Sequence, residues 1–142
     1  MPDKILYKTA ATASGDGRNG TVALDDSSFT ADLATPKELG GAGGDQLNPE
    51  KMFAMGYAAC FLSALRHVAS AKKVKVPDEA TVNTEVGIGP NGSGGFGLDV
   101  SISVSLPGLD ADVAQDLIDT AHAVCPYSNA TRNNLDIKPV LA

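Results

Sequence analysis

The sequence predicts an α+β fold in which strands are grouped around one central helix, in the order β-β-β-α-β-β-α-β. The segment 52–65, in the middle of the chain, contains no charged residue, which is typical of a buried helix. Segments that alternate apolar and polar residues lie on both sides of it, as expected for half-buried strands. Near the C-terminus, apolar residues recur every three or four positions over 110–125 and predict a second, amphipathic helix.

The central helix is expected to begin after Asn48, a favourable N-cap, with Pro49 at the first helical position. Glu50 in the first turn and the lysines that follow residue 71 suit the helix dipole. The uncharged segment is shorter than the roughly 20 apolar residues that a bilayer span needs. We therefore expect no membrane span, and a helix that is covered nearly all round by other elements, from this chain or from a second subunit.

Three strands are predicted before this helix, at 5–13, 21–24 and 29–34, joined by tight turns rich in Gly, Asp and Ser. They are expected to form an antiparallel meander. Residues 35–47 contain Pro36 and five residues of the pattern Gly-Gly-Ala-Gly-Gly, which favour a loop without regular structure. We expect this loop to be a flexible connection, with a mobile lid beside an active site as the alternative.

After the helix, a β-hairpin is predicted from two alternating segments, 82–88 and 98–106, joined by a glycine-rich loop at 90–95. The second of these segments has one apolar and one polar face and is the clearest strand in the chain.

The C-terminal segment is predicted to begin with a helix that Asp110 caps. Cys125 lies on the apolar stripe of this helix, and Pro126 should break the helix there. A short turn or helix at 128–134 and a last strand at 137–141, expected at a sheet edge because it contains a proline, complete the chain.

Composition limits the classes of protein to which this chain can belong. Its 142 residues are enough for a single domain, 1–142, with a substantial core. A net charge of −6 argues against nucleic acid or an anionic membrane as a partner. The N-terminus has no signal-peptide pattern, so a cytoplasmic location is expected. Two cysteines and two histidines at unsuitable spacings argue against a structural zinc site.

Cys60 lies in the middle of the uncharged helix, and the residues alone leave both an inert and a reactive role open. A free buried cysteine often behaves as a small hydrophobic residue, and burial raises the pKa of a thiol. Cys60 lies about 15 Å beyond the first turn of its helix, where the helix dipole has little effect. A reactive Cys60 therefore needs a cation from another part of the chain.

Few cations are candidates for this role. His67 lies on the same face as Cys60 but about 10 Å further along the axis, too far for a hydrogen bond. Arg18 follows the glycine turn at 14–17, a position from which a fold can direct an arginine inward. Glu50 could hold its guanidinium by two parallel hydrogen bonds. Taken alone, each of these charges is also typical of a solvated surface.

Three segments resemble the signatures of the organic hydroperoxide resistance (Ohr) branch of the Ohr/OsmC family. The first is Asn-Pro-Glu at 48–50 with Phe-Ala-Met-Gly-Tyr-Ala-Ala-Cys-Phe at 53–61. The second is Val-Cys-Pro-Tyr-Ser-Asn-Ala-Thr-Arg at 124–132, and the third is Arg-Asn-Gly at 18–20. The resemblance covers essentially the whole chain.

The resemblance implies a thiol-dependent peroxidase that reduces alkyl and fatty-acid hydroperoxides to alcohols. By position, Cys60 is the peroxidatic and Cys125 the resolving cysteine, Arg18 stabilises the thiolate, and Glu50 orients Arg18. Oxidation is expected to pass through a Cys60 sulfenic acid to a Cys60–Cys125 disulfide, which a lipoylated protein or another dithiol reduces. No metal, flavin or haem is expected.

The resemblance also implies an intertwined homodimer with active sites at the subunit interface, in which antiparallel sheets wrap two central buried helices. Two other interpretations stay open: an OsmC-branch peroxidase of different substrate preference, and a non-catalytic dimer that binds an apolar ligand. A pair formed by Arg18 and Glu50 beside a thiol would separate these classes, because a lipid binder has no use for a buried guanidinium.

Overall fold

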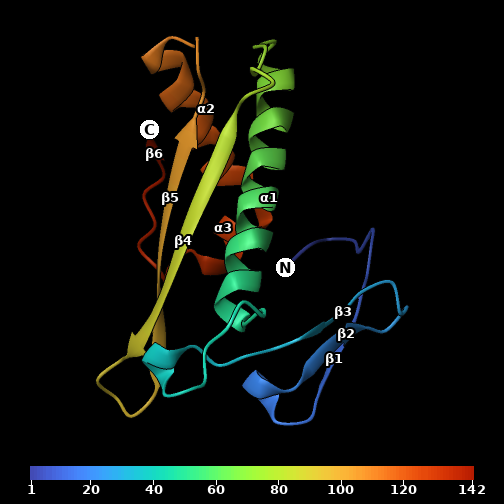
Figure 1. Ribbon diagram of the computed structural model, residues 1–142. Coiled ribbons are helices and arrows are strands. Elements are labelled where there is room, and N and C mark those ends of the chain that lie inside the picture. The colour runs from blue at the N-terminus through green and yellow to red at the C-terminus, as the bar shows by residue number, and fades with distance from the viewer. The chain divides into compact units, whose positions relative to one another are not determined.

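The structure is a computed structural model that describes all of residues 1–142 (Figure 1). It contains two three-stranded sheets and three α-helices, so the predicted α+β class is confirmed. The chain divides into two compact units, Met1–Pro49 and Glu50–Ala142, which are described one after the other. That both units form one domain over 1–142 stays a prediction.

The first unit is built on an antiparallel meander of β1 (Ala11–Ser14), β2 (Thr21–Leu24) and β3 (Thr30–Asp32). The meander is the one predicted, but its first strand is shorter than the expected 5–13. All four residues of β1 pair with the four residues of β2. Beyond this pairing, the Asp25 N–H donates to the Ala10 carbonyl oxygen. Residues 5–9 pair with no strand of this chain, and Ile5, Leu6 and Tyr7 are exposed.

The loop at 35–47 is mostly irregular, as predicted. It contains one short helical turn that was not predicted, because the proline and the glycines favoured a loop without regular structure. A short 3-10 helix, η2 (Lys37–Leu39), follows Pro36 and ends at Gly40. Gly40 adopts a left-handed φ of 83°, which glycine accepts without steric cost.

The second unit contains the long helix α1 (Pro49–Ala71) and a hairpin of β4 (Thr81–Pro90) and β5 (Phe96–Ser105). The two strands pair over ten residues, from Thr81 opposite Ser105 to Pro90 opposite Phe96. The predicted start of α1 at Pro49 and the predicted hairpin are both confirmed.

The last strand differs from the prediction in length and direction. β6 (Val140–Leu141) has two residues and pairs in parallel with β5, so this sheet is not purely antiparallel. The reason is the crossover that precedes it: α2 (Ala111–Val124) and α3 (Pro126–Thr131) carry the chain back before it re-enters the sheet. A crossover of this kind is what a parallel pair requires.

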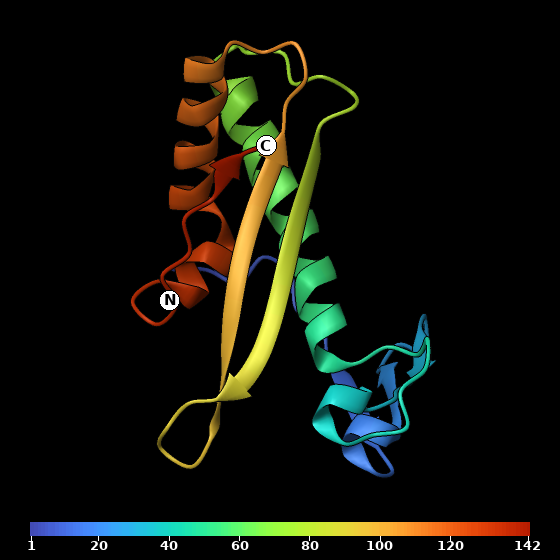
Figure 2. The ribbon, with the colours of Figure 1, turned by 60° about the vertical axis from the view of Figure 1, so that its left-hand side comes forward.

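One face of the β4–β5 hairpin packs against α1 and α2, as Figures 1 and 2 show. The apolar residues of β5 that the alternation identified, Val100, Ile102 and Val104, are buried there. Asp110 caps α2 as predicted, since its side chain accepts hydrogen bonds from the backbone N–H groups of Asp112 and Val113. This core fixes α1 and α2 side by side and thereby determines where the two cysteines lie.

α1 is buried on only one side within the single chain, so the expected near-complete burial stays a prediction that requires a second subunit. Tyr57, Phe61, Leu65 and Val68 face the core, whereas the Met55 side chain is 54% exposed. The second unit supplies one sheet and one neighbouring long helix, which cover one face of α1.

The helix is also longer than the uncharged segment on which the membrane argument relied. Its 23 residues are long and apolar enough, by length and composition alone, to cross a membrane. One such helix is weak evidence of a span, because the core helix of a soluble protein passes the same test.

Candidate active site

The two cysteines of the chain lie together, although 65 positions separate them in sequence. Cys60 is on the middle of α1, and Cys125 joins α2 to α3. Their sulfur atoms are 3.7 Å apart, and the Cys125 thiol donates to the Cys60 sulfur. Both thiols are free; Cys60 is half-buried and Cys125 is fully buried. A disulfide bond is about 2.05 Å long, so a small movement would join them.

Cys125 owes its position to the helix break that Pro126 causes. Its backbone N–H donates to Ala121 in the last turn of α2, and its carbonyl accepts from Asn129 in α3. Its own backbone is extended, at φ −61° and ψ 126°, as expected before a proline. Cys125 is therefore the corner between two helices, and its side chain points into the core.

The surroundings of Cys60 oppose its ionisation on balance. Burial raises the pKa of the Cys60 thiol, and the neighbouring Cys125 thiol raises it further. A hydrogen bond with the Tyr127 backbone lowers the pKa but does not cancel the effect of burial. Because the thiolate is the nucleophile, a reactive Cys60 needs an additional positive charge, as the sequence argument concluded.

Three aromatic rings cluster between α3 and the part of α1 that precedes Cys60. Phe53 and Tyr57 of α1 contact each other edge to face at 5.9 Å between ring centres, and Tyr127 of α3 lies 5.5 Å from Tyr57. The Tyr127 ring lies directly over Gly56, where a Cβ atom would come within 2.9 Å of the Tyr127 hydroxyl oxygen. Glycine at position 56 thus allows α3 to approach α1 closely.

A cluster of hydrogen-bonded side chains next to these rings connects all three helices. Ser128 of α3 is fully buried, and its Oγ lies 2.9 Å from Tyr57 Oη of α1 and 3.0 Å from His122 Nδ1 of α2. Thr131 Oγ1 is 3.3 Å from Tyr57 Oη. A hydroxyl that is buried without such partners would destabilise the fold, so this group holds the three helices in one arrangement.

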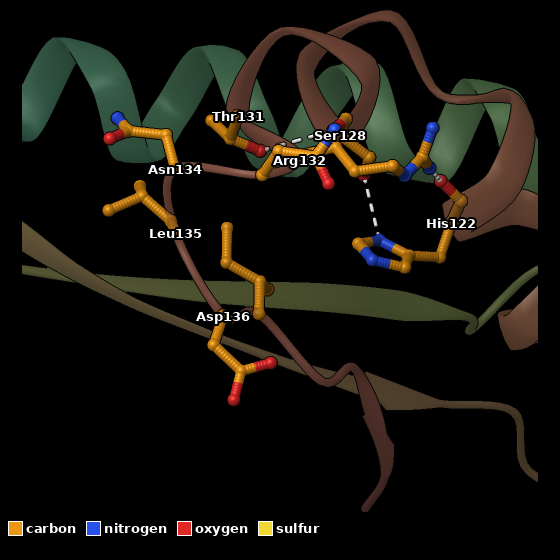
Figure 3. A pocket seen from close by; sticks show the side chains of 9 residues that line it. His122, Ser128, Thr131, Arg132, Asn134, Leu135 and Asp136 are labelled. Atoms are coloured by element: carbon orange, nitrogen blue, oxygen red, sulfur yellow. Dashed lines mark hydrogen bonds between the residues drawn. The ribbon is translucent and has the colours of Figure 1, made fainter.

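His122 lies at the edge of a cavity of about 440 Å³ (Figure 3). Ser128, Thr131 and the segment 132–137 form the rest of its lining. Burial lowers the pKa of His122, and the positive charge of Arg132 lowers it further, while Asp119 acts in the opposite direction. Arg132 also donates to the backbone carbonyl of His122, which fixes the end of α2 beside α3.

Arg18 lies in the first unit, in the short 3-10 helix η1 (Gly17–Asn19). Gly20 closes this turn, and a Cβ atom there would come within 2.0 Å of the Ser14 carbonyl oxygen. Glu50 lies in the first turn of α1, in the second unit. Of the four predicted residues, the structure brings Cys60 and Cys125 together; the pairing of Arg18 with Glu50 and with Cys60 stays a prediction.

The hydrogen-bonded cluster around Ser128 was not predicted from the sequence. Tyr57 and Ser128 lie within the two signatures without a predicted role, and His122 was considered only as a metal ligand. The available signal was their spacing: Tyr57 lies three residues before Cys60, and Ser128 lies three residues after Cys125. The structure contains no cluster of three or more His, Cys, Asp or Glu side chains that could hold a metal ion.

Comparison with known proteins places this geometry in a family. The family model described as OsmC-like protein matches residues 41–140. An organic hydroperoxide resistance protein of Xanthomonas axonopodis pv. citri is 51% identical over 141 residues, which cover 99% of this chain and 98% of the relative. 

Two crystal structures also match nearly the full length of the chain. An organic hydroperoxide resistance protein OsmC from Legionella pneumophila superimposes with a TM-score of 0.92 at 46% identity, over 98% of this chain and 99% of that one. One from Elizabethkingia anophelis superimposes with a TM-score of 0.91 at 50% identity, over 98% of both chains. The chain therefore belongs to the OsmC-like family, in its organic hydroperoxide resistance (Ohr) branch.

Proposed function

We propose that this protein is a cysteine-based peroxidase that detoxifies organic hydroperoxides by reducing them to alcohols. The observation that carries the proposal is the 3.7 Å separation of the Cys60 and Cys125 sulfur atoms. Two reduced cysteines from distant parts of a chain, one half-buried and one fully buried, are arranged as a peroxidatic and a resolving thiol require. Relatives named organic hydroperoxide resistance proteins support the substrate class.

In the first step, the Cys60 thiolate attacks the terminal oxygen of the hydroperoxide. The O–O bond breaks, the alcohol leaves as its alkoxide and takes up a proton, and Cys60 becomes a sulfenic acid. Arg18 is proposed to favour the thiolate and to offset the negative charge that develops on both oxygens. A guanidinium suits this role because it stays charged at any working pH. Glu50 is proposed to orient Arg18.

In the second step, the Cys125 thiol attacks the sulfenic sulfur. A Cys60–Cys125 disulfide forms, and the sulfenic hydroxyl leaves as water with the thiol proton. The two sulfur atoms need to approach by about 1.6 Å to reach disulfide length. An external dithiol, which we propose to be a lipoyl group on a protein, then reduces the disulfide to two thiols. None of these steps uses a metal, flavin or haem.

We further propose that the protein is a homodimer whose active sites lie at the subunit interface, and that it acts in the cytoplasm. The exposed side of α1 supports a dimer, because Met55 there is 54% exposed. Residues 5–9, with three exposed apolar side chains, pair with no strand of this chain. A second subunit would bury both surfaces.

The aromatic and aliphatic residues near Cys60 favour a hydroperoxide with an apolar tail. Tyr127, whose backbone bonds Cys60, is exposed and its ring lies 6.2 Å from the partly buried ring of Phe53. Apolar contacts of this kind give hydrogen peroxide little binding free energy. The alternatives are an OsmC-branch peroxidase of different substrate preference and a non-catalytic dimer that binds an apolar ligand. Competition between a fatty-acid hydroperoxide and hydrogen peroxide, with a lipoyl reductant, separates the first alternative from the proposal.

Thiol counting tests the proposed function directly. Free thiols are measured before and after one equivalent of an alkyl hydroperoxide, in the wild type and in two variants. The wild type should lose two thiols per chain. Cys125→Ser should consume one equivalent and then stop as a sulfenic acid, whereas Cys60→Ser should consume none. An unchanged thiol count in the wild type, or steady turnover by Cys60→Ser, would refute the proposal and favour the binding protein.

A further inference from the structure

We propose that Ser128, held between Tyr57 and His122, is a positioning residue that sets the approach of Cys125 to Cys60. The proposal rests on the proposed function only for the hydroperoxide that oxidises Cys60. Ser128 touches neither sulfur in the contacts described above; it acts through α3, whose first turn follows Cys125.

The hydroxyl contact runs beside the sulfur contact on the same pair of elements. Tyr57 precedes Cys60 by three residues on α1, and Ser128 follows Cys125 by three residues, so each lies about one helical turn from its cysteine. The 2.9 Å contact between Tyr57 Oη and Ser128 Oγ and the 3.7 Å contact between the sulfur atoms therefore connect α1 to the same corner of the chain.

One assignment of donors and acceptors satisfies every contact among these side chains. Thr131 Oγ1 donates to the Tyr127 carbonyl oxygen at 3.0 Å, so it is free to accept from the Tyr57 hydroxyl. Tyr57 then accepts from Ser128, and Ser128 accepts from His122 Nδ1–H. In this order every hydroxyl donates once and accepts once. The series of hydrogen bonds starts at the cavity, where the His122 ring is turned toward Ser128 (Figure 3), and ends on the Tyr127 carbonyl oxygen. The backbone of the same residue also bonds Cys60.

The second step of the proposed reaction depends on this arrangement. α3 has only six residues and is too short to keep its orientation by its own hydrogen bonds. Tyr57 and Ser128 are both fully buried, where no water can replace a lost hydrogen bond, so breaking the bond between them costs free energy. The contact between Tyr57 and Ser128 thus keeps the Cys125 thiol in position to attack the Cys60 sulfenic acid.

Two variants remove the contact with little change in shape. Tyr57→Phe deletes only the phenolic oxygen and keeps the ring that packs on Phe53 and Tyr127. Ser128→Ala deletes the hydroxyl that joins the three helices. Ser70→Ala is the matched control, because it removes an exposed hydroxyl from the far end of α1. Should Ser128→Ala not fold, Tyr57→Phe alone decides the proposal.

The experiment separates the two oxidation steps by rapid mixing with an alkyl hydroperoxide. Sulfenic acid is trapped with a dimedone reagent, and the disulfide is counted by mass spectrometry. In both variants the first step should keep its rate, while disulfide formation slows by about tenfold and trapped sulfenic acid accumulates. Ser128→Thr, which restores a hydroxyl, should recover part of the rate. A purely structural role would lower the melting temperature without changing the ratio of the two rates, and an unchanged ratio in folded variants would overturn the proposal.

A second measurement makes failure of this proposal distinct from failure of the peroxidase assignment. Diamide oxidises the two thiols without any hydroperoxide, and glutathione mixtures then report the equilibrium between disulfide and thiols. The equilibrium constant for disulfide formation should fall by about tenfold in Tyr57→Phe relative to wild type and Ser70→Ala. If the constant falls in Tyr57→Phe but the wild type does not react with hydroperoxides, the positioning role is supported and the proposed function is refuted. Equal constants would refute the positioning role.

Discussion

His122 is a residue whose protonation state the fold controls. Burial and the nearby Arg132 charge lower its pKa, and Asp119 opposes them less strongly. A histidine with a lowered pKa in the folded protein binds its proton more readily when unfolded. It therefore contributes stability above its ordinary, unfolded pKa, and this stability is lost as the pH falls from there toward the folded value.

We predict that the free energy of unfolding decreases as the pH is lowered from about 7 to 5, where an ordinary histidine gains its proton. In the His122→Asn variant the free energy of unfolding should decrease less steeply over the same range. Asparagine keeps a donor near Ser128 but does not titrate. Urea unfolding at several pH values measures the slope. His67→Asn, at an exposed position of α1, serves as the control and should follow the wild type. Parallel curves for the wild type and His122→Asn would contradict the assignment.

At the scale of elements, the chain places its two thiols by ending one helix beside the middle of another. α2 runs to Val124, Cys125 forms the corner, and Pro126 starts α3. The direction of α2 therefore determines where Cys125 arrives at α1. Its first turn is held by Asp110, which accepts from the backbone N–H groups of two following residues.

Removing this cap should destabilise the protein without altering the thiol site. Asp110→Ala is expected to lower the free energy of unfolding by about 1 kcal/mol and the melting temperature by roughly 4 °C. Asp110→Asn, which keeps an acceptor oxygen, should lose much less. Thermal melts of both variants measure the loss, and thiol counting should give wild-type values. An equal loss in the two variants would show that the side-chain cap is not what stabilises the start of α2.

Most elements could be predicted because their signals are local. Alternation identified β5, the pair of Asn48 and Pro49 identified the start of α1, and Asp110 identified the start of α2. The predictions were wrong where residues distant in sequence determine the direction or the length of a strand. The direction of β6 depends on a crossover of two helices, and the extent of β1 depends on the length of β2.

The candidate site divides in the same way. The cysteines could be named from their signatures, because those signatures are contiguous in sequence. The contact of Tyr57 with Ser128 joins positions 71 residues apart, and neither helix indicates on its own which hydroxyl it will meet. Gly56 is a similar case, since its role becomes visible only when the ring of Tyr127 lies over it.

At the scale of the whole molecule, the exposed side of α1 is the feature that indicates a second subunit. A helix with no charge between residues 52 and 65 is buried on one side only by its own chain. Apolar area removed from water contributes about 25 cal/mol per Å², so covering this side with a second copy would stabilise both subunits.

We predict that the protein sediments as a dimer and that Met55→Glu weakens the dimer, because a buried carboxylate without a partner is costly. Analytical ultracentrifugation should show the dissociation constant rising by at least about tenfold. Val113→Glu places the same charge on an exposed apolar position of α2 and should leave the dimer intact. A wild-type monomer, or a Met55→Glu dimer of unchanged affinity, would contradict the proposed interface.

We propose that Arg18 keeps Cys60 ionised against the burial that raises the pKa of its thiol. The most direct test is the pH dependence of Cys60 alkylation by iodoacetamide in a Cys125→Ser background, which leaves one thiol to react. Arg66→Ala, which removes an exposed arginine from the same helix, is the control. Arg18→Ala should raise the midpoint of alkylation by about one pH unit or more, while Arg66→Ala should match the parent. Equal midpoints in Arg18→Ala and the parent protein would contradict the proposal.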